Sequence, residues 1–301
     1  MGKRKRQTDG SPELALPSCE GPKLLPFKHR KSPIQRGSRL DKHRSNASAA
    51  DGYVFQVRIE SKQYALKVFK FHHPEAERSF RSTYLGSTCA IDKDIFYTDP
   101  FYAERRAYGR IQEARDEGRI GPREQIAVKC HGYIFLEDQD RLYLEEKEHL
   151  DFCTDIIDTS LREVLGNDVR IRAIVKDLET DRTQINSKTV RRTLERVKRL
   201  NDLKIYNTDI RADNFVNCRL VDFGRAWTEP YDVLEFMDTK YPKEAYTWRM
   251  KDFLNFKEMI EDEEIKTTLK VFVFSRRQLR SRGKPQEPHS ESSKHRRKRN
   301  K

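Results

Sequence analysis

Residues 206–228 read YNTDIRADNFVNCRLVDFGRAWT, a stretch with two carboxylates and an amide at informative spacings. Asp209 and Asp222 lie thirteen positions apart, Asn214 lies between them, and Asp222 opens the triplet Asp-Phe-Gly. Phosphoryl transfer from ATP needs a carboxylate that orients the attacking hydroxyl. It also needs an amide and a second carboxylate that hold magnesium on the phosphates. We therefore expect Asp209 to orient the hydroxyl, and Asn214 and Asp222 to bind Mg2+.

A purely structural explanation of this stretch stays open at this point. The polar residues 209–214 could form a turn after a helix, and residues 220–223 could be an ordinary strand end. The interval between Asn214 and Asp222 leaves room only for a tight hairpin around Asn217 and Cys218.

Two strands with a lysine on their apolar face are predicted upstream. Apolar residues alternate over 53–59, and residues 64–69 form a plausible hairpin partner. Lys67 shares a face with Ala65 and Phe69, where a lysine needs a counter-charge or a phosphate. The alternative is an edge-strand lysine whose ammonium reaches solvent.

A helix with a buried glutamate follows. Asp99 and Pro100 predict the start of a helix over residues 101–117. Glu104 lies in the middle of the apolar stripe of this helix, so its carboxylate needs a partner. Arg105 and Arg106 are candidates if the helix is tilted.

The spelling of these segments resembles the protein kinases. Asp209 and Asn214 keep the spacing of the catalytic loop H-R-D-x-x-x-x-N, Asp222 begins D-F-G, and Lys67 stands where V-A-I-K has its lysine. The His and Arg of the catalytic loop are replaced by Asn207 and Thr208.

This resemblance implies a role for each charged residue. Lys67, paired with Glu104, would orient the α- and β-phosphates of ATP, and Asp209 would accept the substrate proton. Arg211 lies two residues after Asp209, where Ser/Thr kinases place a lysine near the γ-phosphate.

The resemblance also assigns a nucleotide clamp. Gly52 and Val54 stand where the last glycine and the valine of a Gly-rich loop belong, and Ala65 matches the alanine of V-A-I-K. The other two loop glycines are replaced by Ala47 and Ala49, which implies a looser clamp.

The expected fold is α+β: a bilobal protein-kinase-like fold with a five-stranded antiparallel N-lobe sheet, one helix, and a truncated, mainly helical C-lobe. The strands are predicted at 53–59, 64–69, 126–128, 133–136 and 142–144, with a turn at 137–141 and a hinge at 145–147. Residues 1–46 are expected to form a disordered basic arm, 47–146 the N-lobe with an insertion at 71–98, 147–275 the C-lobe, and 276–301 a disordered basic tail.

The positive charge of the chain belongs to its two ends. Of 61 Lys/Arg and 48 Asp/Glu, residues 1–50 hold 12 and 4 and residues 276–301 hold 11 and 2, which leaves −4 for residues 51–275. Basic residues concentrated at the ends of a chain indicate nuclear import or a weak contact with nucleic acid through these ends. The alternative is that they are simply solvated tails. Five cysteines without a C-x-x-C pair favour a reducing compartment, and no apolar run is long enough to cross a membrane.

A narrower resemblance rests on four segments together: YALKVF at 64–69, ERRAY at 104–108, DIRADNF at 209–215 and VDFGRAWTEP at 221–230. They resemble a fungal group of short kinase-like proteins that includes a subunit of an inner-kinetochore complex. This implies a nuclear, centromere-associated protein with kinetochore partners.

Three functions remain open from the sequence. The first is an ATP- and Mg2+-dependent phosphotransferase of unknown substrate. The second is a pseudokinase scaffold in a kinetochore or chromatin complex, and the third is a small atypical kinase or ATPase acting with RNA-processing machinery. Intact charged residues favour the first. The missing glycines and the missing His-Arg pair favour the second, and only the basic tail supports the third.

Overall fold

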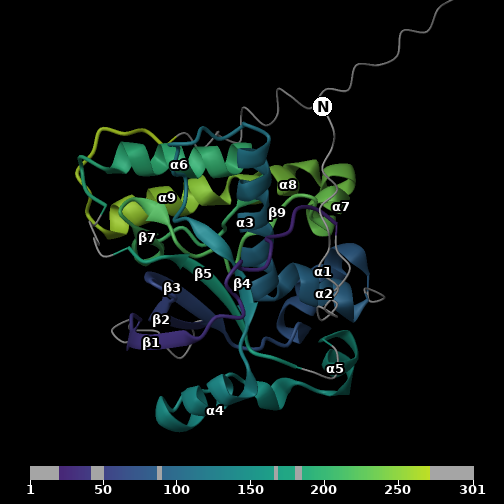
Figure 1. Ribbon diagram of the computed structural model, residues 1–301. Helices are drawn as coiled ribbons and strands as arrows, with labels where there is room; N and C mark the ends of the chain where they lie inside the picture. Colours follow the sequence, from purple (N-terminus) through teal and green to yellow (C-terminus); the bar gives the residue numbers. More distant parts are fainter. Residues whose placement is uncertain (1–19, 42–50, 87–89, 166–168, 180–184, 272–301) are drawn as a thin grey trace, which may run out of the picture. The chain divides into compact units, whose positions relative to one another are not determined.

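A computed structural model describes residues 20–41, 51–86, 90–165, 169–179 and 185–271 of the 301-residue chain. Its main sheet has five strands in the order β1 (Ile34–Arg39), β2 (Gly52–Ile59), β3 (Lys62–Phe69), β5 (Arg172–Asp177) and β4 (Cys130–Phe135). Every neighbouring pair is antiparallel (Figure 1). The predicted α+β class with a five-stranded antiparallel sheet is confirmed.

The two faces of the sheet differ in chemistry. Lys67 lies opposite Val54 and Ile174 in the strand register, and Ala65 lies opposite Lys176, so these side chains share one face. The long helix α3 (Pro100–Asp116) packs on this face, where Phe101 meets Phe69 edge to face. The other face is apolar, and Leu144 of α4 (Asp138–Lys147) approaches it.

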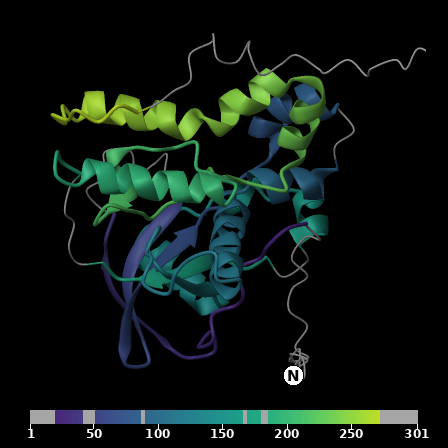
Figure 2. The same ribbon diagram turned by 90° about the horizontal axis from the view of Figure 1, so that it is seen from above.

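The remaining helices lie beside the sheet and beyond it. They are α1 (Glu75–Leu85), α2 (Ile91–Thr98), η1 (Thr154–Ile156), α5 (Thr159–Leu165), α6 (Val190–Asp202), η2 (Ala212–Asn214), α7 (Asp232–Lys240), α8 (Pro242–Arg249) and α9 (Lys251–Asp262). Helices α6 and α9 run side by side (Figures 1 and 2). Two short ladders complete the fold: β6 (Ile205–Tyr206) with β9 (Trp227–Thr228), and β7 (Phe215–Val216) with β8 (Arg219–Leu220).

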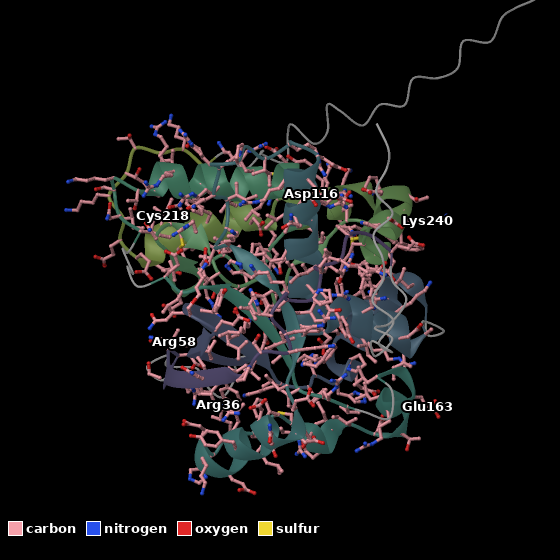
Figure 3. The ribbon with its side chains drawn as sticks, viewed as in Figure 1. Arg36, Arg58, Asp116, Glu163, Cys218 and Lys240 are labelled. Carbon is pink, nitrogen blue, oxygen red and sulfur yellow. The ribbon has the colours of Figure 1, made fainter. Side chains whose placement is uncertain are left out.

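Several local predictions are confirmed. Asp99 caps α3, because its side chain accepts the N–H of Phe101 at 3.0 Å. The tight hairpin falls at Asn217 and Cys218, whose φ angles of 51° and 59° suit a two-residue β-turn. Cys218 lies beside α6 (Figure 3), with its Sγ 3.5 Å from a guanidinium nitrogen of Arg192.

Two of the five predicted strands are wrong. Residues 142–144 lie within α4, so the predicted turn at 137–141 and hinge at 145–147 are wrong too. Of residues 126–128, Ala127 forms a single bridge with Leu220 and the segment joins no sheet. The five-stranded sheet contains β1 and β5 instead of these two predicted strands. β1 is a polar edge strand, and β5 carries Arg172 and Lys176 on a buried face, so neither shows the apolar alternation that identifies strands.

Part of the segment predicted as a disordered arm, residues 1–46, belongs to the fold. Phe27 is fully buried, Pro26 forms a bridge with Tyr133, and β1 belongs to the sheet. Residues 1–19 and 42–46 of that arm, and the tail at 276–301, lie outside the described residues. Within the described part of the chain, no helix has both the length and the apolar character needed to cross a membrane.

The insertion at 71–98 contains α1 and α2. Arg81 of α1 is 1% exposed and donates to Asp94 of α2 at 2.7 Å and to both carboxylate oxygens of Asp232 in α7 at 2.9 and 2.8 Å. Since α2 leads directly into α3, the insertion connects the helix that carries Glu104 with α7.

Candidate active site

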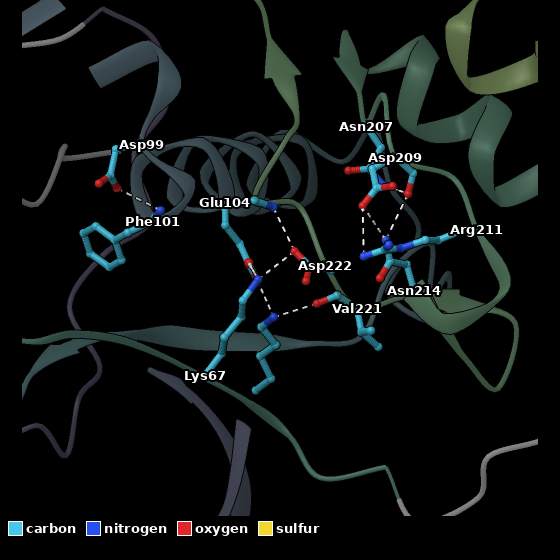
Figure 4. A network of polar contacts seen from close by, with 12 residues as sticks. Lys67, Asp99, Phe101, Glu104, Asn207, Asp209, Arg211, Asn214, Val221 and Asp222 are labelled. Carbon is cyan, nitrogen blue, oxygen red and sulfur yellow. Dashed lines mark hydrogen bonds and ion pairs between the residues drawn. The ribbon is translucent and has the colours of Figure 1, made fainter. Parts of the chain in front are cut away.

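A buried lysine on β3 contacts two carboxylates. Nζ of Lys67 lies 2.9 Å from Oε2 of Glu104 and 2.7 Å from Oδ1 of Asp222 (Figure 4). The Lys67 side chain is 6% exposed, and that of Glu104 is fully buried. Glu104 therefore pairs with Lys67 rather than with Arg105, which donates to the Leu24 carbonyl, or Arg106, which donates to the carbonyls of Thr228 and Pro230.

The ion pair between Lys67 and Asp222 keeps both groups charged. Burial alone would lower the pKa of Lys67, but Asp222, Glu104 and Asp51 outweigh it and hold that pKa above its usual value. Burial alone would raise the pKa of Asp222, but Lys67 and Lys176 hold it well below its usual range. At neutral pH Asp222 is a carboxylate, the form that can bind a cation.

A second lysine, Lys176 of β5, enters the same cluster. Its Nζ donates to the carbonyl of Val221 at 2.6 Å and contacts Oε1 of Glu104. The sequence pattern did not identify Lys176, because charged residues at alternate positions indicate a solvent-exposed strand face, whereas Arg172, Ile174 and Lys176 share a buried one.

The residues predicted for the catalytic loop form a second group. Nδ2 of Asn214 donates to the backbone carbonyl and to Oδ2 of Asp209, both at 3.0 Å, and a guanidinium nitrogen of Arg211 lies 3.5 Å from the same Oδ2. The two groups meet through the backbone, because the N–H of Val221 donates to the carbonyl of Asn214 at 2.9 Å. Figure 4 shows both groups in one region, with Val221 and Asp222 beside Asn214.

A buried aspartate in α9 supports the start of this loop. Asp252 accepts the backbone N–H of Asn207 at 2.9 Å and that of Thr208 at 2.7 Å, and Oγ1 of Thr208 donates to the Arg225 carbonyl at 2.9 Å. Asp252 was also missed, because nothing in the pattern of its helix distinguishes it from a surface residue.

One of the residues expected to hold Mg2+, Asn214, presents an unused oxygen. Oδ1 of Asn214 is buried and has no hydrogen-bond partner among the described residues, which leaves it available as an oxygen ligand. Asp222 uses Oδ1 for Lys67 and for the N–H of Gly224. No group of three or more His, Cys, Asp or Glu side chains in the described ranges is arranged for a metal. Such a site would therefore depend on Asn214, Asp222 and the phosphates together.

The three residues assigned to the nucleotide clamp lie in different surroundings. Val54 and Ala65 are half-buried on the face that carries Lys67, where a nucleotide base could contact them. Gly52 has a structural reason of its own, because a Cβ there would lie 2.1 Å from the Val68 carbonyl oxygen. The preceding residue, Asp51, places Oδ2 against Gly224, the residue two positions after Asp222.

Comparison with known families supplies the assignment. The family model described as kinetochore Sim4 complex subunit FTA2 matches residues 12–227. The chain belongs to this family. The FTA2 match contains Lys67, Glu104 and all of residues 206–227, whereas Asp252 of α9 lies beyond it.

The structural and curated comparisons add little to the FTA2 assignment. A solved structure of vaccinia related kinase 3 matches with 11% identity and a TM-score of 0.33 over 71% of this chain. The chain spans 53% of that structure's length. At this TM-score the similarity carries no argument, and the kinase-like interpretation rests on the contacts of Lys67 with Glu104 and Asp222. The comparison with curated proteins gave no significant match.

Proposed function

We propose that this protein is a nuclear kinetochore subunit whose kinase-like cleft binds ATP with Mg2+ and transfers a phosphoryl group. The ion-pair geometry of Lys67 carries the proposal, since one buried ammonium is shared by Glu104 on α3 and Asp222 at the start of Asp-Phe-Gly. Family membership supports the kinetochore role and protein partners in that complex. The substrate hydroxyl belongs to an unknown protein or small molecule.

Each residue then has a defined task. Lys67 binds the α- and β-phosphates, and Glu104 holds its ammonium in place. Asn214 and Asp222 would hold Mg2+, and the bound ion would supply positive charge to the phosphates. Asp209 accepts the proton of the attacking hydroxyl, and Arg211, 3.5 Å from it, faces the transferred group.

A scaffold that performs no chemistry is the second candidate. It is favoured by Asp51, whose carboxylate lies against Gly224 and repels phosphates. It is also favoured by the short path from Gly224 to β9, which leaves no long segment there for docking a peptide substrate. The RNA-associated alternative depended on the tail, which lies outside the described residues, and nothing in the described residues favours it.

Thermal unfolding with and without ATP and Mg2+ tests nucleotide binding. A ligand at about 100 times its Kd stabilises the folded state by about 2.7 kcal/mol, so the wild type should melt at a higher temperature. Lys67→Met and Asp222→Asn should abolish the shift, whereas Lys62→Met, an exposed lysine on the same strand, should keep it. A wild-type melting temperature that ATP and Mg2+ leave unchanged would rule out the proposal.

ATP turnover separates the two candidates. The proposal expects turnover in the wild type and at least about a 100-fold loss in Asp209→Asn, the size of a typical general-base contribution. Nucleotide binding with equal, background turnover in both proteins would support the scaffold instead.

A further inference from the structure

We propose that Lys176 is a second positioning lysine of the cleft, which shares Glu104 with Lys67 and fixes Asp222 through the carbonyl of Val221. The inference rests on the proposed nucleotide site and adds a residue to its cation-binding arrangement.

The position of Lys176 follows from the sheet. It lies opposite Ala65 in the β3–β5 register, and strand alternation places its side chain on the face that carries Lys67. Lys176 is 5% exposed and its Nζ lies 5.5 Å from the centre of the Tyr108 ring. A buried ammonium without partners is costly, so its contacts with Glu104 and Val221 define where it can lie.

The contacts divide Glu104 between two lysines. Oε2 of Glu104 binds Lys67 and Oε1 binds Lys176, so rotation of the carboxylate would break both ion pairs. Because Oε1 has no other hydrogen-bond partner among the described residues, Lys176 supplies the only counter-charge at this oxygen there. The orientation of Glu104, and through it that of Lys67, therefore depends on Lys176.

Nucleotide binding would make use of these contacts of Lys176. Lys67 must exchange Asp222 for phosphate oxygens, and Asp222 must then face Mg2+. Lys176 keeps its hydrogen bond to Val221, the residue before Asp222, throughout this exchange. It thus holds the backbone that aims the Asp222 carboxylate.

Hydrogen exchange tests the positioning role without nucleotide. In Lys176→Met, a peptide covering residues 219–226 should exchange at least about 10-fold faster, while residues 52–69 stay within about threefold of the wild type. Lys176→Arg keeps a charged donor and should protect 219–226 nearly as well as lysine. Lys129→Met, an exposed lysine near the end of the same strand pair, is the matched control and should change neither segment. Equal acceleration of both segments, or none, would overturn the proposal.

The Mg2+ dependence of ATP binding tests the functional role. Lys176→Met should raise the Mg2+ concentration for half-maximal thermal stabilisation by about 10-fold, the lower end of the loss expected when a residue that orients a metal ligand is removed. Lys176→Arg should restore it to within about threefold. An unchanged Mg2+ midpoint in a folded Lys176→Met protein would show a structural role only. Should this variant not fold, Lys176→Gln, which keeps a donor for Val221 but no charge, replaces it in both measurements. If the wild type binds no nucleotide, the proposed function fails, while hydrogen exchange still decides the role of Lys176.

Discussion

The carboxylate of Asp252 accepts the backbone N–H of Thr208 at 2.7 Å, although the two residues lie 44 positions apart. Thr208 has a φ of 60°, a left-handed conformation that is rare and unfavourable for a β-branched residue. It directly precedes Asp209. Helix α9 thus holds the backbone from which the proposed catalytic carboxylate projects.

Removal of this support should destabilise the fold. Asp252→Ala leaves the N–H groups of Asn207 and Thr208 buried without acceptors, and each costs about 1–3 kcal/mol. We expect a loss of about 3 kcal/mol in the free energy of unfolding, measured with urea. Asp262→Ala, at the exposed end of the same helix, should change it by less than about 0.5 kcal/mol. Equal stabilities of the two variants would contradict this account.

The buried Arg81 should contribute more to stability than a neighbouring exposed arginine. Arg81→Met leaves Asp94, which is fully buried, without its closest cation, and breaking a buried pair in this way costs about 3–5 kcal/mol. Arg78 lies 3.7 Å from the same carboxylate, but its side chain is 42% exposed, so Arg78→Ala should cost less than about 1 kcal/mol. Chemical denaturation of both variants measures the difference. Similar losses would show that Arg81 does not compensate Asp94.

Gly52 should be needed for the stability of the sheet even when no ligand is bound. A Cβ at this position would lie 2.1 Å from the Val68 carbonyl oxygen, so Gly52→Ala must separate β2 from β3. We expect a loss of about 3 kcal/mol in unfolding free energy without any nucleotide present. Gly121→Ala, where the nearest atom is 3.9 Å away, should be tolerated. Wild-type stability of Gly52→Ala, with only nucleotide affinity reduced, would restore the loop-glycine interpretation.

The pH dependence of stability should show the contribution of Asp177. Oδ1 of Asp177 lies 2.7 Å from Nε2 of His131 and 3.1 Å from Nζ of Lys62, and these contacts lower its pKa to about 2. A carboxyl group whose pKa is depressed in the folded state stabilises it above the ordinary pKa, and this stabilisation is lost as the pH falls through the folded value. The side chain is 31% exposed, so we discount the full shift for solvent screening and expect about 1 kcal/mol at pH 7.

Urea unfolding of the wild type and Asp177→Asn between pH 7 and pH 2 measures this contribution. The difference should be constant down to about pH 4 and should vanish near pH 2. Asp116→Asn, at the exposed end of α3, controls for the loss of a carboxylate as such. A difference that persists unchanged at pH 2 would assign the effect to packing.

The sequence predicted those parts of the site that lie on regular elements. Lys67 and Glu104 each interrupt an apolar pattern, so each required a buried partner, and the structure places them 2.9 Å apart. Asp209 and Asn214 were found by their spacing, which a short hydrogen-bonded loop preserves.

The missed parts depend on contacts between distant segments. Arg172 in β5 is 2% exposed because it pairs with Asp99, the N-cap of α3, at 2.9 Å. Pattern analysis assigns charged residues to the surface, so it could not identify β5 as a buried central strand. Residues 142–144 were predicted as a strand but lie in a helix, since a short apolar run fits a strand or a helix equally well.

The position of the insertion has a thermodynamic consequence. Arg81 ties α1 to α2 and α7, and α2 continues into the helix that presents Glu104. If engagement of Arg81 shifts α3, a kinetochore protein that binds α1 more tightly in that state would change the affinity of the Lys67 site for its ligand. By reciprocity, the ligand would change the affinity for that protein by the same factor. Assembly and occupancy of the cleft would then be two readouts of one equilibrium.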